Sequence, residues 1–270
     1  MIRIEKNDSV WTIIHSRFAE ARNGMDPESA DALVKAFTDF DQDPSASVAV
    51  LWGEGGAFCA GADLKYASTL TDRERVDAEV IDGLAFPTGA NSAPRGPLGP
   101  TRLELSKPVI AAVEGPAVAG GMELAMWADM RVLAEDAYFG VYCRRWGIPL
   151  LDGGAVRLAR LVGEGRALDI ILTGRKVEAD EAHRIGLCER VTKSGQARNT
   201  AEALAQEIAR FPQGAVRADR RTAIESYGLS IREGMRREWE NGANALRSEG
   251  TKGAVRFSQG AGRHGDFTNI

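Results

Sequence analysis

Two glycine-bearing turns, each between an apolar strand-like run and a helix-like run, are the parts of this sequence best suited to chemistry. Residues 53–64 read Gly-Glu-Gly-Gly-Ala-Phe-Cys-Ala-Gly-Ala-Asp-Leu, and residues 114–124 read Glu-Gly-Pro-Ala-Val-Ala-Gly-Gly-Met-Glu-Leu. Because glycine has no side chain, the backbone N–H groups of such turns can approach a ligand. The first N–H groups of a helix also lack partners within it. Two facing turns could therefore direct two N–H donors at one oxygen that gains negative charge, which is an oxyanion hole.

Small-residue turns also serve simply to pack strands against helices, so neither turn alone establishes a site. Neither is a phosphate loop, because no Gly-Lys-Ser/Thr follows its glycines, and the first strand–helix junction lacks the dinucleotide fingerprint Gly-x-Gly-x-x-Gly. Glu123 adds a carboxylate to the second turn. It either acts on a ligand as an acid or base, or only gains from the dipole at the start of the helix.

The elements that position these turns are predicted from local patterns. Residues 10–15 and 47–52 are short and rich in β-branched and aromatic residues, which predicts strands. Between them a helix is expected to begin with Asp26 as N-cap and Pro27 at its first position. Its buried face is expected to contain Leu33, Phe37 and Phe40. A strand, a helix and a strand in succession indicate an α/β unit.

The rest of the chain continues in the same way and then becomes helical. Residues 109–113 predict a buried strand, and residues 122–128 predict the helix that follows the second turn. Residues 86–100 hold four prolines and three glycines, which predicts an irregular loop. From residue 197 to about residue 247 the pattern is largely helical. We therefore predict an α/β core over residues 1–195 and a helical C-terminal region over residues 196–270.

The composition of the 270 residues is that of a globular protein, with 44% hydrophobic and 27% charged residues. The formal net charge of −4 argues against a partner such as nucleic acid or a membrane surface, since these attract clustered positive charge. The three cysteines are odd in number and show no metal spacing, so neither a disulfide framework nor a metal site is expected. With charged residues near its start and no long apolar run, the chain is expected to be cytoplasmic.

Residues 58–65, Phe-Cys-Ala-Gly-Ala-Asp-Leu-Lys, resemble the segment Phe-x-Ala-Gly-Ala-Asp-Leu/Ile-Lys of the crotonase superfamily, the enoyl-CoA hydratase/isomerase family. The resemblance extends over roughly residues 1–260 with consistent spacing. Further matching stretches are residues 107–115, 119–125, 128–131, 139–140, 153–158, 171–175 and 181–187. The resemblance implies an α/β fold, a crotonase-like spiral of ββα units with a helical C-terminal trimerisation region. It also implies a homotrimer or a dimer of trimers.

The same resemblance implies a site for an acyl-CoA thioester. The N–H groups of Ala62 and Gly120 match the two donors of the oxyanion hole, and Glu123 matches the first catalytic glutamate of the hydratases. Positions that line the CoA are matched by Ala60, Asp63, Leu64 and Lys65. Lys65 is a candidate cation for a CoA phosphate or else a solvated lysine, and Arg22 is a second candidate. No metal, flavin or nicotinamide is implied, because coenzyme A enters as part of the substrate.

The sequence departs from the hydratase pattern at Cys143, which stands twenty residues after Glu123 where the second glutamate is expected. Arg144 and Arg145 could lower the pKa of its thiol from the usual value near 8.5. The simpler alternative is that Cys143 is a small buried core residue, and the other is that its thiol acts as a nucleophile on the thioester. Asp152 supplies another carboxylate in this region. It either faces the carbons of the substrate as a catalytic residue or caps the helix that follows.

Three functions remain open from the sequence. The first is a 2-enoyl-CoA hydratase that uses Glu123, with Asp152 as a further catalytic candidate. The second is an enoyl-CoA isomerase, which needs one carboxylate to move one proton. The third is a crotonase-fold protein that binds acyl-CoA with little catalysis, and a specialised reaction such as thioester hydrolysis lies between these. The turns and Glu123 favour an enzyme, and Cys143 keeps the binding role open. Among the three functions we predict the hydratase. We expect residues 86–100 to help select the acyl group.

Overall fold

The computed structural model describes residues 1–89 and 93–267, so three residues of the predicted 86–100 loop lie outside the described part. A sheet in the strand order β1-β2-β3-β4-β6-β9 forms the centre of the fold. Its strands are β1 (Ile2–Asn7), β2 (Val10–His15), β3 (Val48–Gly53), β4 (Val109–Val113), β6 (Met130–Ala134) and β9 (Arg190–Thr192). Strand β1 runs antiparallel to β2, and all the other pairs are parallel. A second sheet has the order β5-β7-β8 and comprises Pro116–Val118, Tyr138–Gly140 and Lys176–Glu178.

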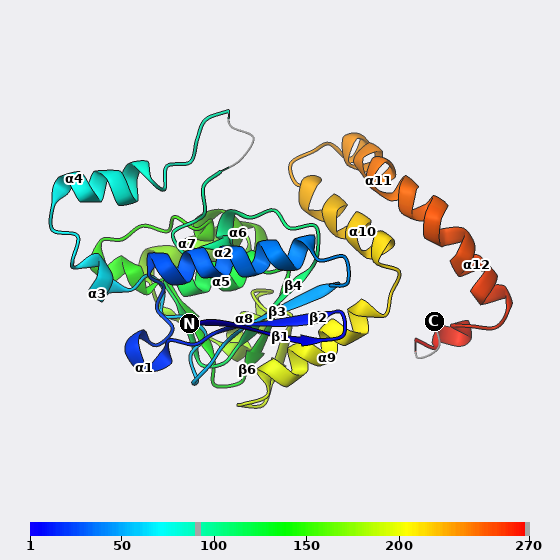
Figure 1. The fold of residues 1–270 in the computed structure, drawn as a ribbon, viewed down its shortest axis with the longest axis horizontal. Coiled ribbons are helices and arrows are strands. Elements are labelled where there is room, and N and C mark those ends of the chain that lie inside the picture. Colours follow the sequence, from blue (N-terminus) through cyan, green and yellow to red (C-terminus); the bar gives the residue numbers. More distant parts are fainter. Residues whose placement is uncertain (90–92, 268–270) are drawn as a thin grey trace.

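The central strands are apolar because helices cover them. Every residue of β2 and of β4 is buried, as expected for parallel strands packed on both faces. Helix α2 (Pro27–Gln42) packs against β1 and β2, and α9 (Ala197–Ala209) packs against β2, β3 and β4. In the view of Figure 1, α2 lies above the sheet and α9 below it. Since β3 and β4 are parallel, the turns that follow them leave the same edge of the sheet.

Shorter helices and the C-terminal helices complete the fold. Those around the edge of the sheet are α1 (Phe18–Ala21), α3 (Leu64–Ala67), α4 (Arg73–Val76), α5 (Gly120–Trp127), α6 (Gly154–Val162), α7 (Glu164–Thr173) and α8 (Ala179–Arg184). Short 3₁₀ helices span Pro100–Arg102, Tyr142–Trp146 and Arg263–Gly265, and π turns follow α4 and α11 at Asp77–Asp82 and Leu246–Gly250. Helix α4 projects away from the body of the molecule (Figure 1).

The predicted elements of the core are confirmed with small shifts. Asp26 caps α2 by accepting a hydrogen bond from the Ser29 N–H at 2.8 Å, and the predicted buried face of α2 is buried. Strand β3 begins at Val48, one residue later than predicted. Helix α5 begins at Gly120, two residues earlier than predicted, and the three-residue strand β5 lies inside the second turn.

The C-terminal helices α10 (Gln213–Glu225), α11 (Ile231–Ala245) and α12 (Thr251–Ser258) extend away from the sheet (Figure 1). On α11, Ile231, Met235 and Trp239 are spaced four residues apart and are 85%, 66% and 67% exposed. They therefore form one apolar stripe with no partner within the described residues. Helix α9 differs because it packs on the sheet, and the division at residues 195 and 196 stays a prediction. No helix of the described chain has the length and apolar character needed to cross a membrane.

Candidate active site

The two glycine-bearing turns meet at the edge of the sheet. The carbonyl of Pro116 accepts hydrogen bonds from the N–H groups of Phe58 and Cys59 at 3.0 and 3.3 Å, and the Val118 N–H donates to the Cys59 carbonyl at 3.0 Å. A Cβ atom added at Gly121 would lie 2.0 Å from the Cys59 oxygen, so glycine is required at this contact. The structure thus brings together the two turns that the sequence analysis singled out.

The N–H groups of Ala62 and Gly120 are available at this junction. Neither has a backbone acceptor among the residues that the structure describes. Ala119 precedes the second donor with φ +53° and ψ −126°, a conformation that an alanine rarely adopts and that costs about 1–3 kcal/mol. Ala62 and Gly120 both line a pocket of about 170 Å³. A Cβ added at Gly61 would lie 3.0 Å from the Gly120 nitrogen, which shows how closely the first turn approaches the second donor.

Glu123 lines the same pocket and is 3% exposed. Its Oε1 accepts hydrogen bonds from the backbone N–H groups of Asp152 at 2.9 Å and Gly154 at 2.8 Å. Burial, assisted by the charge of Asp152, raises the pKa of Glu123 to about 7 although these two N–H groups favour the carboxylate. Within the described residues Oε2 has no hydrogen-bond partner. A carboxyl with this pKa can both take and give a proton near neutral pH.

Asp152 is 2% exposed and also lines the pocket. Its Oδ1 accepts hydrogen bonds from the Leu98 N–H at 3.0 Å and from the Thr101 hydroxyl. The N-cap of α6 is Gly153, with no side-chain cap bond, so the alternative that Asp152 caps this helix is wrong. Burial raises the pKa of Asp152 against the opposing effect of the Thr101 hydrogen bond. The carboxylate therefore lines the pocket while its Oδ1 is bonded to residues 98 and 101, which precede β4 in the chain.

Arg157 completes this network. Its guanidinium donates to the Asp152 carbonyl at 2.7 Å and to the Thr101 carbonyl at 2.8 Å, which joins α6 to the segment around residue 101. The segment in turn covers the second donor, since a Cβ added at Gly120 would lie 2.4 Å from Cδ2 of Leu98. No role for Leu98, Thr101 or Arg157 follows from the sequence. Arg157 lies in a matched stretch, but no sequence signal indicates that it bonds to a residue more than fifty positions away.

Cys143 is 5% exposed and lines the pocket from the 3₁₀ helix Tyr142–Trp146. The expectation that neighbouring arginines lower the pKa of its thiol is wrong. Burial raises this pKa, the charge of Glu123 adds to the rise, and Arg144 only opposes it. The thiol is therefore neutral near pH 7 and is a poor nucleophile in this environment.

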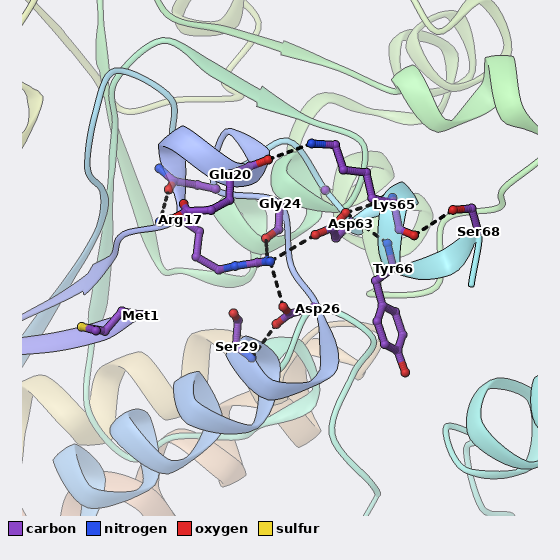
Figure 2. Close-up of polar contacts among 12 residues, drawn as sticks. Met1, Arg17, Glu20, Gly24, Asp26, Ser29, Asp63, Lys65, Tyr66 and Ser68 are labelled. Atoms are coloured by element: carbon purple, nitrogen blue, oxygen red, sulfur yellow. Dashed lines mark hydrogen bonds and ion pairs between the residues drawn. The ribbon is translucent and has the colours of Figure 1, made fainter. Parts of the chain in front are cut away.

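The predicted CoA-binding residues lie in three places. Ala60 and Leu64 line the pocket beside the hole donors. Lys65 and Arg22 are exposed and line a shallow hollow of about 530 Å³ next to α1, where the Lys65 ammonium donates to the Glu20 carbonyl at 3.1 Å. The carboxylate of Asp63 is engaged by protein partners, as Figure 2 shows. A ligand could thus contact Asp63 only through other atoms of this residue.

The arrangement can stabilise a negative oxygen and transfer a proton beside it. Two free N–H groups, a carboxyl with a pKa near 7 and a second buried carboxylate share one pocket with mainly apolar walls. Among the described residues, no group of three or more His, Cys, Asp or Glu side chains could hold a metal ion.

Comparison with known proteins agrees with this geometry. A sequence profile described as Enoyl-CoA hydratase/isomerase matches residues 5–84 and 100–245. Enoyl-CoA hydratase EchA19 of Mycobacterium tuberculosis is 35% identical over 239 residues, which are 86% of this chain and 84% of that protein. A carnitinyl-CoA dehydratase of Salmonella arizonae is 33% identical over 237 residues, which are 87% and 84% of the two chains. The crystal structure of enoyl-CoA hydratase EchA1 from Mycobacterium marinum matches with a TM-score of 0.83 and 32% identity, over 96% of this chain and 95% of that chain.

Proposed function

This chain belongs to the enoyl-CoA hydratase/isomerase family, and we propose that it adds water to a 2-enoyl-CoA thioester through an enolate bound in its oxyanion hole. The observation that carries the proposal is the pocket that combines the Ala62 and Gly120 N–H groups with Glu123. Relatives named as enoyl-CoA hydratases, over most of both chains, support the same reaction.

In the proposed mechanism the thioester oxygen accepts hydrogen bonds from both N–H groups. The Glu123 carboxylate takes a proton from water while the water oxygen bonds to C3, and the electron pair of the C2–C3 double bond moves toward the thioester oxygen. The N–H donors stabilise the resulting enolate. Glu123, now a carboxylic acid, returns the same proton to C2. One water is added in total, and one carboxyl whose pKa is about 7 suffices for both transfers.

Asp152 is proposed to support Glu123 in this site. Its backbone N–H bonds to Glu123, and its negative charge helps to raise the pKa of Glu123. A direct catalytic role in proton transfer stays a prediction. An Asp152→Asn variant tests it, because asparagine keeps an acceptor for Leu98 and Thr101 but cannot exchange a proton. Loss of nearly all turnover in this variant would support the direct role.

We propose that the CoA part of the substrate is bound by the residues that the sequence predicted for it. Lys65 and Arg22 would bind phosphate groups of the CoA, while Ala60, Leu64 and the backbone of Asp63 would line it. Water addition transfers no electrons in the net reaction, so we propose no cofactor apart from the CoA of the substrate. We propose no nucleic acid or membrane partner.

We also propose a homotrimer or a dimer of trimers in the cytoplasm. The exposed stripe of Ile231, Met235 and Trp239 on α11 supports burial against another copy, because large apolar side chains at helical spacing favour packing. The three cysteines are free, as is usual in a reducing compartment. Sedimentation of the wild-type protein and of a Trp239→Glu variant tests the assembly. A monomeric wild type would contradict it.

The test of the reaction is mass spectrometry of 2-enoyl- and 3-enoyl-CoA esters incubated with the protein in heavy water. Gain of one heavy water by a 2-enoyl ester would establish hydration, provided that Glu123→Gln abolishes it. Migration of the double bond without this gain would establish the isomerase, which the single glutamate beside Cys143 also permits. Esters that bind but do not change would contradict the hydratase and favour a binding role.

A further inference from the structure

The two proposed hole donors are held in different ways. Gly120 begins the eight-residue helix α5, whose residues 120–126 are buried. Ala62 is exposed and lies between Gly61 and the four-residue helix α3, so little of its own helix fixes it. The direction of the Ala62 N–H must therefore depend on contacts from outside this short segment.

Met25 supplies the backbone contacts. Its N–H donates to the Gly61 carbonyl at 2.8 Å, and its carbonyl accepts from the Asp63 N–H at 2.8 Å. These two hydrogen bonds flank Ala62 and form an isolated parallel bridge between Met25 and Ala62. The position of the donor is thus tied to the segment that contains Met25.

Arg17 holds the side-chain contacts of this region together, as Figure 2 shows. Its Nη2 forms ion pairs with Asp26 at 2.8 Å and with Asp63 at 3.1 Å, while Nη1 donates to the Gly24 carbonyl at 2.6 Å. The Arg17 and Asp63 side chains are only 18% and 8% exposed, so water screens this pair weakly. A guanidinium presents its donors in a fixed fork, which allows one side chain to bind three acceptors at once.

Both ends of this arrangement are anchored. The other oxygen of Asp63 caps α3 by accepting from the N–H groups of Lys65 at 2.9 Å and Tyr66 at 3.3 Å. The Arg17 N–H donates to the side chain of Asn23, which is fully buried and bonds to carbonyls of the first turn. Displacement of Arg17 would therefore free the Asp63 side of the donor segment and leave a nearly buried carboxylate unpaired.

We propose that Arg17 is a positioning residue for the reaction: by binding Asp63, Asp26 and the Gly24 carbonyl together, it fixes the Ala62 N–H in the oxyanion hole. This role rests on the proposed function, because it requires that Ala62 donate to a thioester oxygen. Arg17 itself needs no contact with the substrate. Loss of its guanidinium is expected to weaken polarisation of the thioester carbonyl more than binding of the CoA.

The test uses the CoA thioester of cinnamic acid, a conjugated probe whose absorption moves to longer wavelength when its carbonyl is polarised by hydrogen bonds. Because this probe is itself a 2-enoyl thioester, spectra are recorded immediately after mixing, before hydration can remove the conjugated double bond, with saturating wild-type protein, Arg17→Met and Asp63→Asn. Asparagine can still cap α3, so Asp63→Asn removes mainly the ion pair and serves if Arg17→Met fails to fold. We expect the wild type to shift the absorption and both variants to lose much of the shift. We also expect kcat for hydration to fall about 100-fold, with a smaller change in KM.

Arg220→Met is the matched control. It removes an ion pair with Asp129 that has a 2.8 Å separation and side-chain exposures of 19% and 20%, outside the proposed site. This control should keep both the spectral shift and kcat even where it lowers stability. A wild-type shift that persists in Arg17→Met and Asp63→Asn, with kcat unchanged, would overturn the role of Arg17 alone. Absence of a shift in the wild type would contradict the proposed hole itself, and with it this role.

Discussion

Glu123→Gln should abolish turnover and, at the same time, stabilise the fold above neutral pH. Glutamine has nearly the same shape as glutamate, and its side-chain oxygen can still accept the hydrogen bonds from Asp152 and Gly154. It cannot take a proton from water. Since loss of a general acid–base group typically costs about 10²–10⁴ in rate, we expect at least this loss in kcat for hydration.

The expected gain in stability follows from the pKa of Glu123. Burial raises this pKa from 4.5 to about 7, so the folded protein holds the proton more tightly than the unfolded chain does. Stability contributed by the protonated carboxyl is fully present below pH 4.5 and is lost as the pH rises through 7. The difference corresponds to on the order of 3 kcal/mol. Glutamine is uncharged at every pH, so the variant avoids this loss.

The assay is urea unfolding of both proteins at pH 4.5 and at pH 8, together with the pH dependence of kcat/KM for the wild type. The variant should be the more stable protein at pH 8, and the difference should shrink at pH 4.5. Wild-type hydration should fall about tenfold for each pH unit below about 7, because the base must be ionised. Equal stabilities at pH 8, or a rate independent of pH from 5 to 8, would refute the reasoning.

Three further changes test other parts of the structure. Gly154→Ala places a Cβ 2.6 Å from Cγ of Glu123, so steady-state kinetics should show kcat lower by about 100-fold with an unchanged circular dichroism spectrum. Cys143→Ala should lower kcat for hydration by less than the roughly 100-fold that follows the loss of an acid–base group. Loss of nearly all turnover would instead indicate that the thiol is catalytic. His15 is buried with both ring nitrogens unpartnered among the described residues, and burial lowers its pKa to about 4. Between pH 6.5 and 4 the unfolded chain gains a proton that the folded protein resists, at a loss on the order of 3 kcal/mol, so His15→Leu should remove this part of the pH dependence of urea unfolding.

Local signals were sufficient for the framework of the fold. The cap at Asp26, the proline after it and the apolar spacing along α2 are all short-range features, and the helix starts where they predict. Strand β1 was not predicted, because only two apolar residues, Ile2 and Ile4, alternate with charged residues in this largely exposed segment. The short strand β5 has too few residues for a recognisable period within a small-residue turn.

The sequence was sufficient to predict residues of the pocket lining in or near the matched motifs, but not the contacts between distant segments that hold them. The network around Asp152 joins Leu98, Thr101 and Arg157 over distances of more than fifty residues in the sequence, so it depends on tertiary packing. The pKa of the Cys143 thiol likewise depends on tertiary packing. Its sequence neighbours are cations, yet burial controls its pKa, and burial cannot be inferred from the order of the residues alone.

Cys143, where the sequence departs from the hydratase pattern, is physically related to the additional carboxylate of Asp152. Asp152 already raises the pKa of Glu123 by its charge, and Glu123 raises the pKa of the Cys143 thiol. A third carboxylate in place of Cys143 would add repulsion in a pocket where burial already disfavours charge. Glu123 would then be protonated over more of the neutral range, so a smaller fraction of the protein would carry the carboxylate that takes a proton from water in the proposed mechanism. A neutral thiol at position 143 avoids this effect.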